Sequence, residues 1–534
     1  MVKLWKPSAR ASRTRGSIRI SFRHMVIFLG CAYLLALLPY VLTRSRRAAE
    51  PEQSSIVPSD LGYAIDTTRT IPEFRERLSE DDNTVVTPAI DDKAFPVDWF
   101  SECGCTGIEV ESVNICVGLL PLFPGLRINR CPNRCKGPPA YLAAALRTLT
   151  SPRRAEARIV VVHIAYQGVC GLPNELSEFE GMAGEGVAPG QERPYLIARA
   201  MAEEDRIPEE AVQRCAQNFD EVWVPSHFNR AAFARSGVDS SKLFRIPETI
   251  DLRHYSRAAV RAPARLFPDQ PGVRFAFLSV FKWEERKNWP VLLGAFCDAF
   301  RNNSAVALYV KTSAYQGVHP YLEAKDFLED KESVLGEAGD YAGARGGVLG
   351  EDEESYWTHL KEDAPAKRLL GADELMMQQF RSTLSFCGTT IVLDESKIST
   401  NSMPALYAGA DAFVLPSHGE GWGLPLMEAM AMELPTIGTD FSGNKDFMND
   451  HNSYLIRVED MLEGPDGGQW ANPSEQHLKE LLQRVWEERD SDIQRRKIRL
   501  ARQELNENYG DGRGITEVSS RLAAIVTQTR RKYH

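Results

Sequence analysis

Acidic residues are absent from the first 47 positions of this 534-residue chain, whereas ten Lys and Arg residues lie there. Seven of the ten precede position 25, and an apolar run over 25–42 follows them. The run is near the minimum length that spans a bilayer, and the more basic flank is expected to stay in the cytosol. The sequence therefore predicts a single-pass type II membrane protein with a cytosolic tail (1–24), a transmembrane signal anchor (25–43) and a stem (44–95).

A convincing small-residue cleavage site is also missing after the apolar run, where Arg44-Ser45-Arg46-Arg47 stands instead. Together with the long basic segment before the run, this favours a retained anchor over the alternative, a cleaved signal peptide. Because a short span suits early secretory membranes, we expect the Golgi membrane, with the endoplasmic reticulum next. The part of the chain after about residue 44 is then luminal.

Basic residues become scarce beyond this segment. The rest of the chain carries 53 Lys and Arg against 73 Asp and Glu, a formal charge of −20. This balance disfavours nucleic acid as a partner. The length, with a hydrophobic content of 43%, allows two or three domains with ample buried core, so a globular enzyme is the default class.

Two signatures of other enzyme classes are missing. Ser226 and Ser417 follow strand-like runs but lie outside any G-x-S-x-G motif, so neither is a nucleophile elbow. The sequence Asp490-Ser491-Asp492 has the Asp-x-Asp form of a metal site, but it lies in a charged late helix and we expect no metal there. No internal repeat is visible.

Cysteines cluster at the start of the luminal part. Six of the ten lie between positions 103 and 170, and in an oxidising compartment such a cluster is expected to form disulfides. Fifteen pairings are open. A zinc site is the alternative, although the C-x-C spacing fits the usual knuckle poorly. The six are Cys103, Cys105, Cys116, Cys131, Cys135 and Cys170.

Short β-rich runs alternate with helical patterns in two successive series, which argues for parallel α/β sheets. We expect two Rossmann-like domains, 96–265 and 266–534, facing a cleft with ligand at the carboxyl ends of the strands. The Gly-rich, acidic segment 323–363 is predicted to be an insertion that loops from the second domain, and helical spacing begins after Pro473. The expected strands are 113–120, 158–164, 221–224 and 242–246, then 273–280, 305–311, 390–393, 412–415 and 435–438.

A Gly-rich turn follows the run 412–415. Gly421 and Gly423 permit a tight backbone path, and Pro425 stands where a first helical position tolerates proline. The pattern predicts a helix N-terminus at the end of a parallel strand. Free amides there, at Gly423 and Leu424, carry about half a positive charge and suit the diphosphate of a nucleotide.

Two glutamates, Glu420 and Glu428, flank this turn with seven residues between them. The segment 416–448 resembles the donor-site signature of the family-4 retaining glycosyltransferases, which have the GT-B fold. The resemblance implies that Glu428 holds the ribose of a nucleotide-sugar and that Glu420 contacts the transferred sugar. The alternative is that both residues merely cap and solvate a helix.

The start of the second domain, 277–296, is similar to the strand, turn and helix in which that family grips the donor diphosphate with an Arg and a Lys. Lys287 matches the Lys, but Phe281 occupies the position of the Arg. Lys282 or Arg286 could supply the second charge, and cations placed there would stabilise the leaving diphosphate. A solvated turn with internal ion pairs is the alternative.

The first domain resembles this family more weakly than the second domain does. Its segments 224–226 and 246–251 resemble the family's "VPS" strand end and the "IPNGID" stretch before the linker. With the donor half, the resemblance covers about residues 110–460. It also implies that terminal helices cross back to the first domain.

Two groups of residues in the first domain are candidates for the cleft. His163 ends an apolar run, and in relatives a histidine at a strand end can touch the donor sugar; a core or loop histidine is the alternative. Arg199, Glu204 and Asp205 could line the cleft, but we favour a helix over 195–208 with one charged face.

The resemblance implies a retaining glycosyltransferase that moves a sugar from a nucleotide-sugar to a glycan, protein or lipid acceptor, with no metal or other cofactor. Glu420, Lys287 and His163 are the expected catalytic residues. The alternatives are a nucleotide-sugar epimerase or hydrolase of the same fold, and a luminal protein that binds sugars without catalysis. The expected donor-binding residues are Lys282, Arg286, Gly421, Gly423, Leu424 and Glu428.

Overall fold

The computed structural model describes residues 97–101, 107–123, 125–128, 159–164, 168–183, 193–314, 318–337, 381–510 and 513–533. These lie in one compact unit, Asp66–His534. The predicted tail, anchor and stem lie outside the described residues. Within the described ranges, no helix has both the length and the apolar character needed to cross a membrane.

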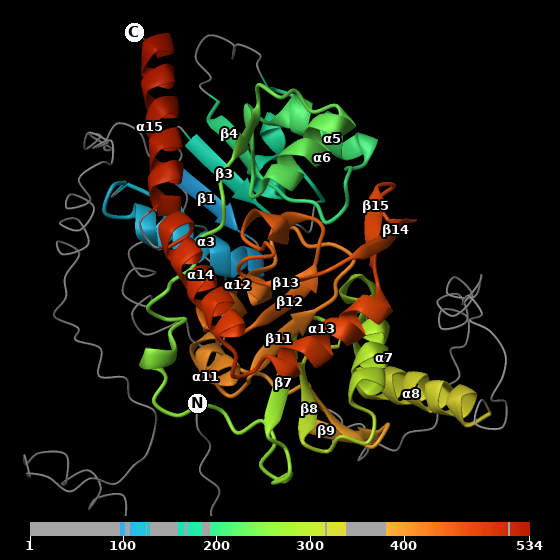
Figure 1. The fold of residues 1–534 in the computed structure, drawn as a ribbon. Helices are drawn as coiled ribbons and strands as arrows, with labels where there is room; N and C mark the ends of the chain where they lie inside the picture. Colours follow the sequence, from blue (N-terminus) through green and yellow to red (C-terminus); the bar gives the residue numbers. More distant parts are fainter. Residues whose placement is uncertain are drawn as a thin grey trace, which may run out of the picture. The chain divides into compact units, whose positions relative to one another are not determined.

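The first sheet is entirely parallel and comes from the first half of the chain (Figure 1). Its central strands are buried along their whole length, as expected when helices cover both faces of a parallel sheet. In spatial order the strands are β2 (Arg127–Ile128), β1 (Val97–Ser101), β3 (Ile159–His163), β4 (Tyr195–Arg199), β5 (Glu221–Val224) and β6 (Leu243–Arg245).

The second sheet is parallel except for its edge strand β9, which pairs antiparallel with β10. It follows the first sheet in sequence, so the prediction of two successive α/β sheets is confirmed. In spatial order the strands are β13 (Tyr454–Ile456), β12 (Thr436–Thr439), β11 (Ala412–Leu415), β7 (Phe275–Val280), β8 (Val306–Lys311), β10 (Thr389–Asp394) and β9 (Arg381–Phe386). A separate hairpin joins β14 (Val458–Glu463) and β15 (Gln469–Pro473).

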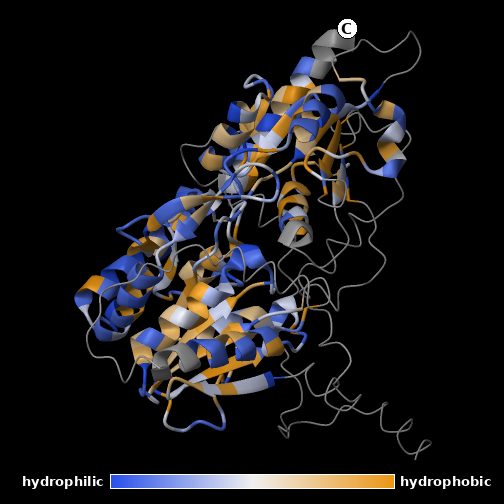
Figure 2. Cartoon of the chain, turned by 90° about the vertical axis from the view of Figure 1, so that its right-hand side faces the viewer, coloured by the Kyte–Doolittle hydropathy of each residue, from blue (hydrophilic) through white to orange (hydrophobic). Residues whose placement is uncertain are grey.

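Helices cover these sheets, and hydrophobic residues concentrate in the strands and on the helix faces against them (Figure 2). The last helix, α15, packs on the first sheet, because its Val518 and Leu522 share one core cluster with Trp99 and Ile115. The α-helices are α3 (Gly107–Leu119), α5 (Glu209–Asn218), α6 (His227–Ser236), α7 (Trp289–Phe300), α8 (Pro320–Glu337), α11 (Met403–Ala408), α12 (Leu424–Ala431), α13 (Glu475–Glu487), α14 (Asp492–Asn508) and α15 (Arg513–Tyr533). Short 3-10 helices are η3 (Asn174–Phe179), η4 (Arg257–Ala259), η5 (Glu285–Lys287), η8 (Thr400–Ser402) and η9 (Gly443–Asp446).

Two expectations about secondary structure are wrong, and a third can be compared with the structure only in part. The apolar run 113–120 belongs to helix α3, and a short apolar run that is buried on several sides does not reveal its period. The segment 195–208 begins with strand β4 and not with a helix. The segment 323–363 was predicted to be an insertion, but its first part, 323–337, lies in helix α8, whose Ala324 and Leu328 belong to the hydrophobic core. Residues 338–363 lie outside the described ranges.

Cysteine pairing also differs from the prediction. Cys170 bonds to Cys215, outside the predicted cluster, and Cys116 is a buried free thiol in α3. A second disulfide joins Cys297 to Cys387. The other four cysteines of the cluster, and with them the zinc alternative, lie outside the described residues.

Candidate active site

The Gly-rich turn connects β11 to α12 as the sequence predicts. Gly423 precedes the helix with φ of 99°, a left-handed conformation that favours glycine, and Pro425 lies in the first turn of α12. A Cβ atom at Gly419 would lie 2.1 Å from the carbonyl oxygen of Glu203, so this position also requires glycine. Glu203 lies in the loop that follows β4, so the turn packs against this loop of the first sheet.

Backbone amides at the turn remain available. The N–H of Glu420 donates to Ser442 Oγ (2.7 Å). Within the described part of the chain, no hydrogen bond uses the N–H groups of Gly421, Gly423 or Leu424. Because unpaired amides at a helix N-terminus attract anions, the turn has the local structure of a phosphate site.

Glu420 lies among cations. Its carboxylate accepts a hydrogen bond from Lys287 Nζ at 2.7 Å, and Arg286 Nη1 lies 3.5 Å from its second oxygen. Burial alone would raise the pKa of Glu420, but Lys287 and Arg286 outweigh it and hold the pKa below its usual value. Burial lowers the pKa of Lys287, and Arg286 adds to this, while Glu420 opposes it.

Arg286, and not Lys282, supplies the second cation beside Glu420. The guanidinium of Arg286 also donates to the carbonyl of Gly419 (2.7 Å), whereas Lys282 is exposed. Phe281, at the position of the family's Arg, is buried and stacks on Trp283. The chain therefore places an aromatic stack where the family pattern has a charge, and a neighbouring residue provides the charge.

Glu428 has a different environment from Glu420. One carboxylate oxygen accepts a hydrogen bond from the Tyr255 hydroxyl (2.6 Å) and the other from the Tyr407 hydroxyl (2.7 Å). Burial raises the pKa of Glu428 to about 7, against the two tyrosine hydrogen bonds. Each oxygen keeps further lone pairs, so a ligand hydroxyl could join these bonds without displacing them.

A second cluster of polar residues is buried at the carboxyl ends of the first sheet's strands. His163, at the end of β3, bonds through Nδ1 to Ser112 Oγ (2.8 Å), and its Nε2 lies 3.4 Å from Glu111 Oε2. Arg199, at the end of β4, donates to Glu111 Oε1 through Nε (2.9 Å) and Nη2 (2.6 Å). Burial lowers the pKa of His163 to about 4, and Glu111 only partly offsets this.

Glu248 completes this cluster from the segment after β6. Burial raises its pKa well above the usual value, and Glu111 adds to the shift. Glu420 acts on Glu248 in the same direction, so the clusters of the two sheets lie within electrostatic reach of each other. Sequence reasoning missed Glu111 and Glu248. Glu111 lies just before the run 113–120 that was predicted to be a strand, and Glu248 lies in the stretch 246–251, which was used only for its resemblance to the family.

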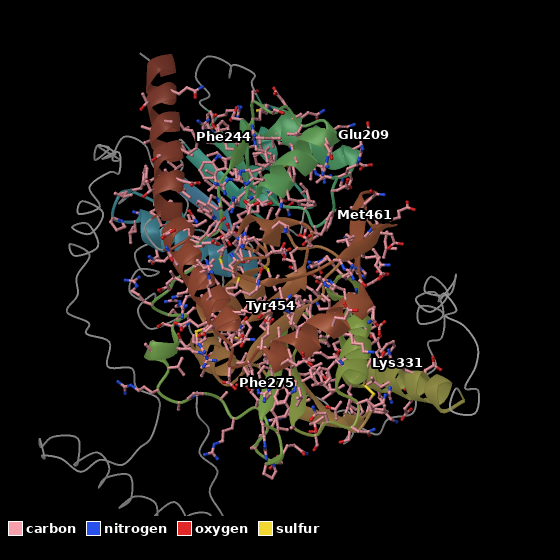
Figure 3. The ribbon with its side chains drawn as sticks, viewed as in Figure 1. Glu209, Phe244, Phe275, Lys331, Tyr454 and Met461 are labelled. Atoms are coloured by element: carbon pink, nitrogen blue, oxygen red, sulfur yellow. A yellow bond between two sulfur atoms is a disulfide. The ribbon has the colours of Figure 1, made fainter. Side chains whose placement is uncertain are left out.

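The loop after β4 contacts the β14–β15 hairpin, whose Met461 is labelled in Figure 3. Glu204 accepts hydrogen bonds from the N–H groups of Asp466 (3.0 Å) and Gly468 (2.7 Å), and Asp205 Oδ1 accepts one from Gln469 (2.9 Å). Glu204 and Asp205 thus lie in a loop that joins the first sheet to the β14–β15 hairpin, and not on a charged helix face.

A second set of contacts joins elements around the first sheet to the Gly-rich turn. Asn229, in α6, donates from Nδ2 to the carbonyl of Gly421 (2.9 Å), and Arg286 Nη2 lies 3.6 Å from Glu203. His418, just before the turn, bonds to the carbonyl of Ala471 in the hairpin (2.7 Å). Residues from both sheets therefore surround the turn.

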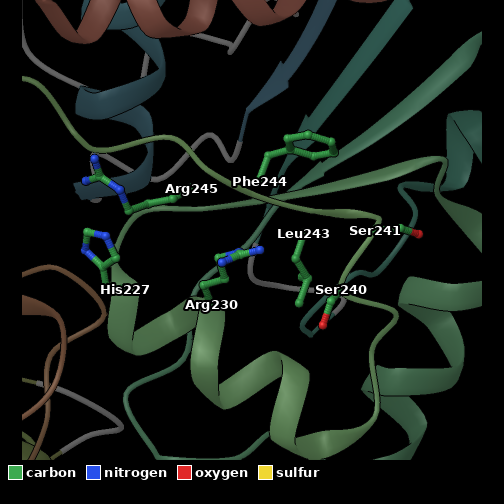
Figure 4. Close-up of a pocket in the computed structure, with 7 residues that line it drawn as sticks. All are labelled: His227, Arg230, Ser240, Ser241, Leu243, Phe244 and Arg245. Atoms are coloured by element: carbon green, nitrogen blue, oxygen red, sulfur yellow. The ribbon is translucent and has the colours of Figure 1, made fainter.

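A shallow pocket of about 330 Å³ lies between α6 and β6 (Figure 4). His227 and Arg245 both contact Asp446 of η9, at 3.1 and 3.4 Å. None of the predicted site residues lines this pocket. Its lining consists of His227, Arg230, Ser240, Ser241, Leu243, Phe244 and Arg245.

The Asp-x-Asp sequence has a structural role. Ser491 caps α14 by accepting the N–H of Gln494, and the exposed Asp492 pairs with Arg495 at 2.8 Å. Among the residues that the structure describes, no group of three or more His, Cys, Asp and Glu side chains is arranged to hold a metal ion.

One family model matches part of the chain. Residues 368–464, which include Glu420 and Glu428, match the family model described as Glycosyl transferases group 1. No significant match is found among curated protein sequences.

Several solved structures are similar to the chain at a TM-score of 0.49. Anabaena Alr3699/HepE in complex with UDP and glucose is 11% identical, with 81% of this chain and all of that chain covered. A glycosyltransferase from Rickettsia africae is 11% identical over 81% of this chain and 98% of its own. Sucrose-phosphate synthase from Thermosynechococcus elongatus is 13% identical over 82% of this chain and all of its own. Through residues 368–464, the chain is thus similar to the group 1 glycosyl transferases.

Proposed function

We propose that this protein is a retaining glycosyltransferase of the GT-B fold, which moves a sugar from a nucleotide-sugar to a glycan, protein or lipid acceptor. The observation that carries the proposal is the buried Lys287–Glu420 pair beside the unused amides of Gly421, Gly423 and Leu424. The family match over residues 368–464 supports it.

The diphosphate of the donor would dock at the N-terminus of α12. Its charge would draw the ammonium of Lys287 and the guanidinium of Arg286 away from Glu420, to which both are bound in the absence of ligand. Preorganised cations and amides of this kind stabilise negative charge as it develops on a leaving group. Glu420, released from its partners, can then accept hydrogen bonds from hydroxyls of the transferred sugar.

Transfer with retention needs no protein nucleophile. The bond between the anomeric carbon and the phosphate oxygen breaks, and the acceptor oxygen forms its bond on the same face. The acceptor's proton passes to the leaving phosphate. In this proposal Lys287 and the α12 amides carry the charge of the diphosphate, so the reaction uses no metal or cofactor.

We also propose that residues 1–95 hold the protein in the Golgi membrane through the anchor 25–43, with the described part in the lumen. The basic residues before position 25 and the apolar run 25–42 support this topology. Protease protection of the described part in sealed Golgi vesicles is the expected result. Digestion without detergent would contradict the luminal placement.

A thermal-shift screen tests the donor assignment. The full chain, in detergent, is mixed with UDP-glucose, GDP-mannose and ADP-glucose, and one of the three is expected to raise Tm because it binds the folded state. Lys287→Met should abolish that shift, while Lys282→Met, at an exposed position, should keep it. If no nucleotide-sugar or its nucleoside diphosphate raises the Tm of the wild-type chain, the proposed function is wrong.

A further inference from the structure

The sequence contains a single acceptor motif for N-glycosylation, Asn-x-Ser/Thr with x other than proline, at Asn302-Asn303-Ser304. The stretch Asn-Pro-Ser at 472–474 has the excluded proline in the middle. Asparagine and serine are common residues, so one such motif can arise by chance in a chain of this length. The surroundings of residues 302–304 therefore decide whether the motif is suited to carry a glycan.

The motif lies on the surface, in the turn between helix α7 and strand β8. Asn302 and Ser304 are exposed, whereas Asn303 between them is half-buried. The two side chains that the motif requires are thus the two that face solvent. A glycan is bulky and hydrophilic, so its attachment site must lie on the surface of the folded protein, and this turn meets that condition.

The hydrogen bonds of the turn use other groups. The main-chain N–H of Asn302 donates to the carbonyl of Cys387 (2.7 Å), and the side chain of Asn303 accepts the N–H of Ala305 (3.1 Å). Within the described part of the chain, no hydrogen bond uses the Asn302 carboxamide or the Ser304 hydroxyl. A glycan on the Asn302 amide nitrogen would therefore break no hydrogen bond of the fold.

Two disulfides support an oxidising compartment for this part of the chain. They are Cys170–Cys215 and Cys297–Cys387. Disulfides form and persist in secretory compartments and are rare in the cytosol. The second of them adjoins the motif, because Cys387 is the residue whose carbonyl binds the Asn302 main chain. This support for a luminal placement is independent of residues 1–95.

The motif lies at the opposite end of the second sheet from the Gly-rich turn. Residues 302–304 lead into β8, whereas the Gly-rich turn follows the carboxyl end of β11. Strand β7 lies between β8 and β11 and runs parallel to both, so the three strands share one direction. A glycan at Asn302 would stand at the amino ends of the strands and would leave the candidate active site open.

We propose that Asn302 carries an N-linked glycan. The co-substrate is an oligosaccharide linked through a diphosphate to a lipid, and an oligosaccharyltransferase of the secretory pathway catalyses the transfer. The amide nitrogen of Asn302 forms a bond to the anomeric carbon and loses one proton, and the bond from that carbon to the lipid diphosphate breaks. The proposal rests on the luminal placement proposed above and not on the transferase activity of this chain.

Expression of the full chain in a mammalian cell line tests the site. Peptide N-glycosidase removes N-linked glycans, so the wild-type protein should migrate faster on a denaturing gel after treatment. Ser304→Ala, which destroys the motif and keeps Asn302, should migrate like the treated wild type and should not shift. Ser304→Thr is the matched control, because it keeps the motif and should shift like the wild type. A treated wild type that does not shift would contradict the proposal.

Mass spectrometry assigns the glycan to its residue. The glycosidase converts a glycosylated asparagine to aspartate with an oxygen from water, so treatment in heavy-oxygen water should label position 302. A sample kept in the same water without enzyme corrects for spontaneous deamidation. A label at another asparagine, with none at position 302, would contradict the assignment to Asn302.

An introduced motif separates the two ways in which the proposal can fail. Asp239→Asn creates Asn-Ser-Ser in an exposed turn before β6, and asparagine can accept the N–H of Ser241 as Asp239 does (2.9 Å). If the introduced motif is glycosylated and Asn302 is not, the inference alone is wrong. If neither carries a glycan, the luminal placement is wrong and the inference falls with it. The thermal-shift screen tests the transferase assignment separately from both results.

Discussion

The two sides of the candidate site are built from the sequence in different ways. On the second sheet, Glu420 and the α12 amides belong to a single turn, and Lys287 follows a neighbouring strand. On the first sheet, Glu111, His163 and Glu248 come from three elements separated by many residues. A local motif can be recognised in a sequence, whereas a cluster assembled by strand order has no spacing to recognise.

The two sides also differ in how their charges are balanced. On the second-sheet side, Lys287 and Arg286 both neutralise Glu420, so this carboxylate has its partners without a ligand. Among the described residues, the first-sheet side keeps three unpaired polar atoms, Glu111 Oε2, His163 Nε2 and Glu248 Oε2. An unpaired buried polar atom costs stability, and four substitutions test this difference between the two sides.

The largest effect is expected for Arg199→Met. This substitution would leave Glu111 buried without its cation and close to Glu248, and breaking a buried pair costs about 3–5 kcal/mol. Urea unfolding of the full chain measures the loss. Arg495→Met, which breaks the exposed pair with Asp492, should cost far less than Arg199→Met because solvent screens this pair. Equal losses for the two variants would show that the first-sheet cluster contributes little to folding.

Lys287→Met should act mainly on catalysis. Removing one group that stabilises developing charge typically lowers kcat by about 10²–10³-fold. Stability should fall less than in Arg199→Met, because Arg286 still lies beside Glu420. Steady-state kinetics with the donor found by the thermal-shift screen measure the change, with Lys282→Met as the control. A kcat within tenfold of wild type would contradict the role of Lys287.

Glu428→Gln should change how stability depends on pH. Burial raises the pKa of Glu428 from 4.5 to about 7, so the folded state binds this proton more tightly than the unfolded state. The wild-type free energy of unfolding should then fall as pH rises from 4.5 to 7, by about 1–3 kcal/mol from this group. Gln does not titrate and should remove this component. The measurement is the difference in unfolding free energy between variant and wild type at pH 5 and at pH 7.5; a constant difference would refute the shifted pKa.

The smallest effect is expected for Glu204→Gln. A glutamine has one acceptor oxygen in place of two, so it cannot bind the amides of Asp466 and Gly468 as the carboxylate does. The expected cost is about 1–2 kcal/mol. Hydrogen exchange should show faster exchange at the Gly468 amide. Unchanged exchange there would mean that the hairpin does not depend on this contact.

Two sequence runs show how much of the secondary structure a local pattern predicts. The run 221–224 coincides with β5, because β-branched and aromatic residues bounded by polar ones suit a buried strand. The run 113–120 has similar residues and is a helix. In α3, Ile115 and Leu119 are buried in a core cluster that includes residues of α15, about 400 positions later in the chain.

The sequence by itself determined the strand, Gly-rich turn and helix around Glu420, because glycine conformations, proline at a first helical turn and free terminal amides are properties of neighbouring residues. Tertiary structure decided that Arg286 replaces Lys282 beside Glu420, that Glu428 binds two tyrosines, and that Glu111, His163 and Glu248 meet. These contacts depend on strand order and on helices that pack from distant parts of the chain, and no local pattern encodes the distances between them.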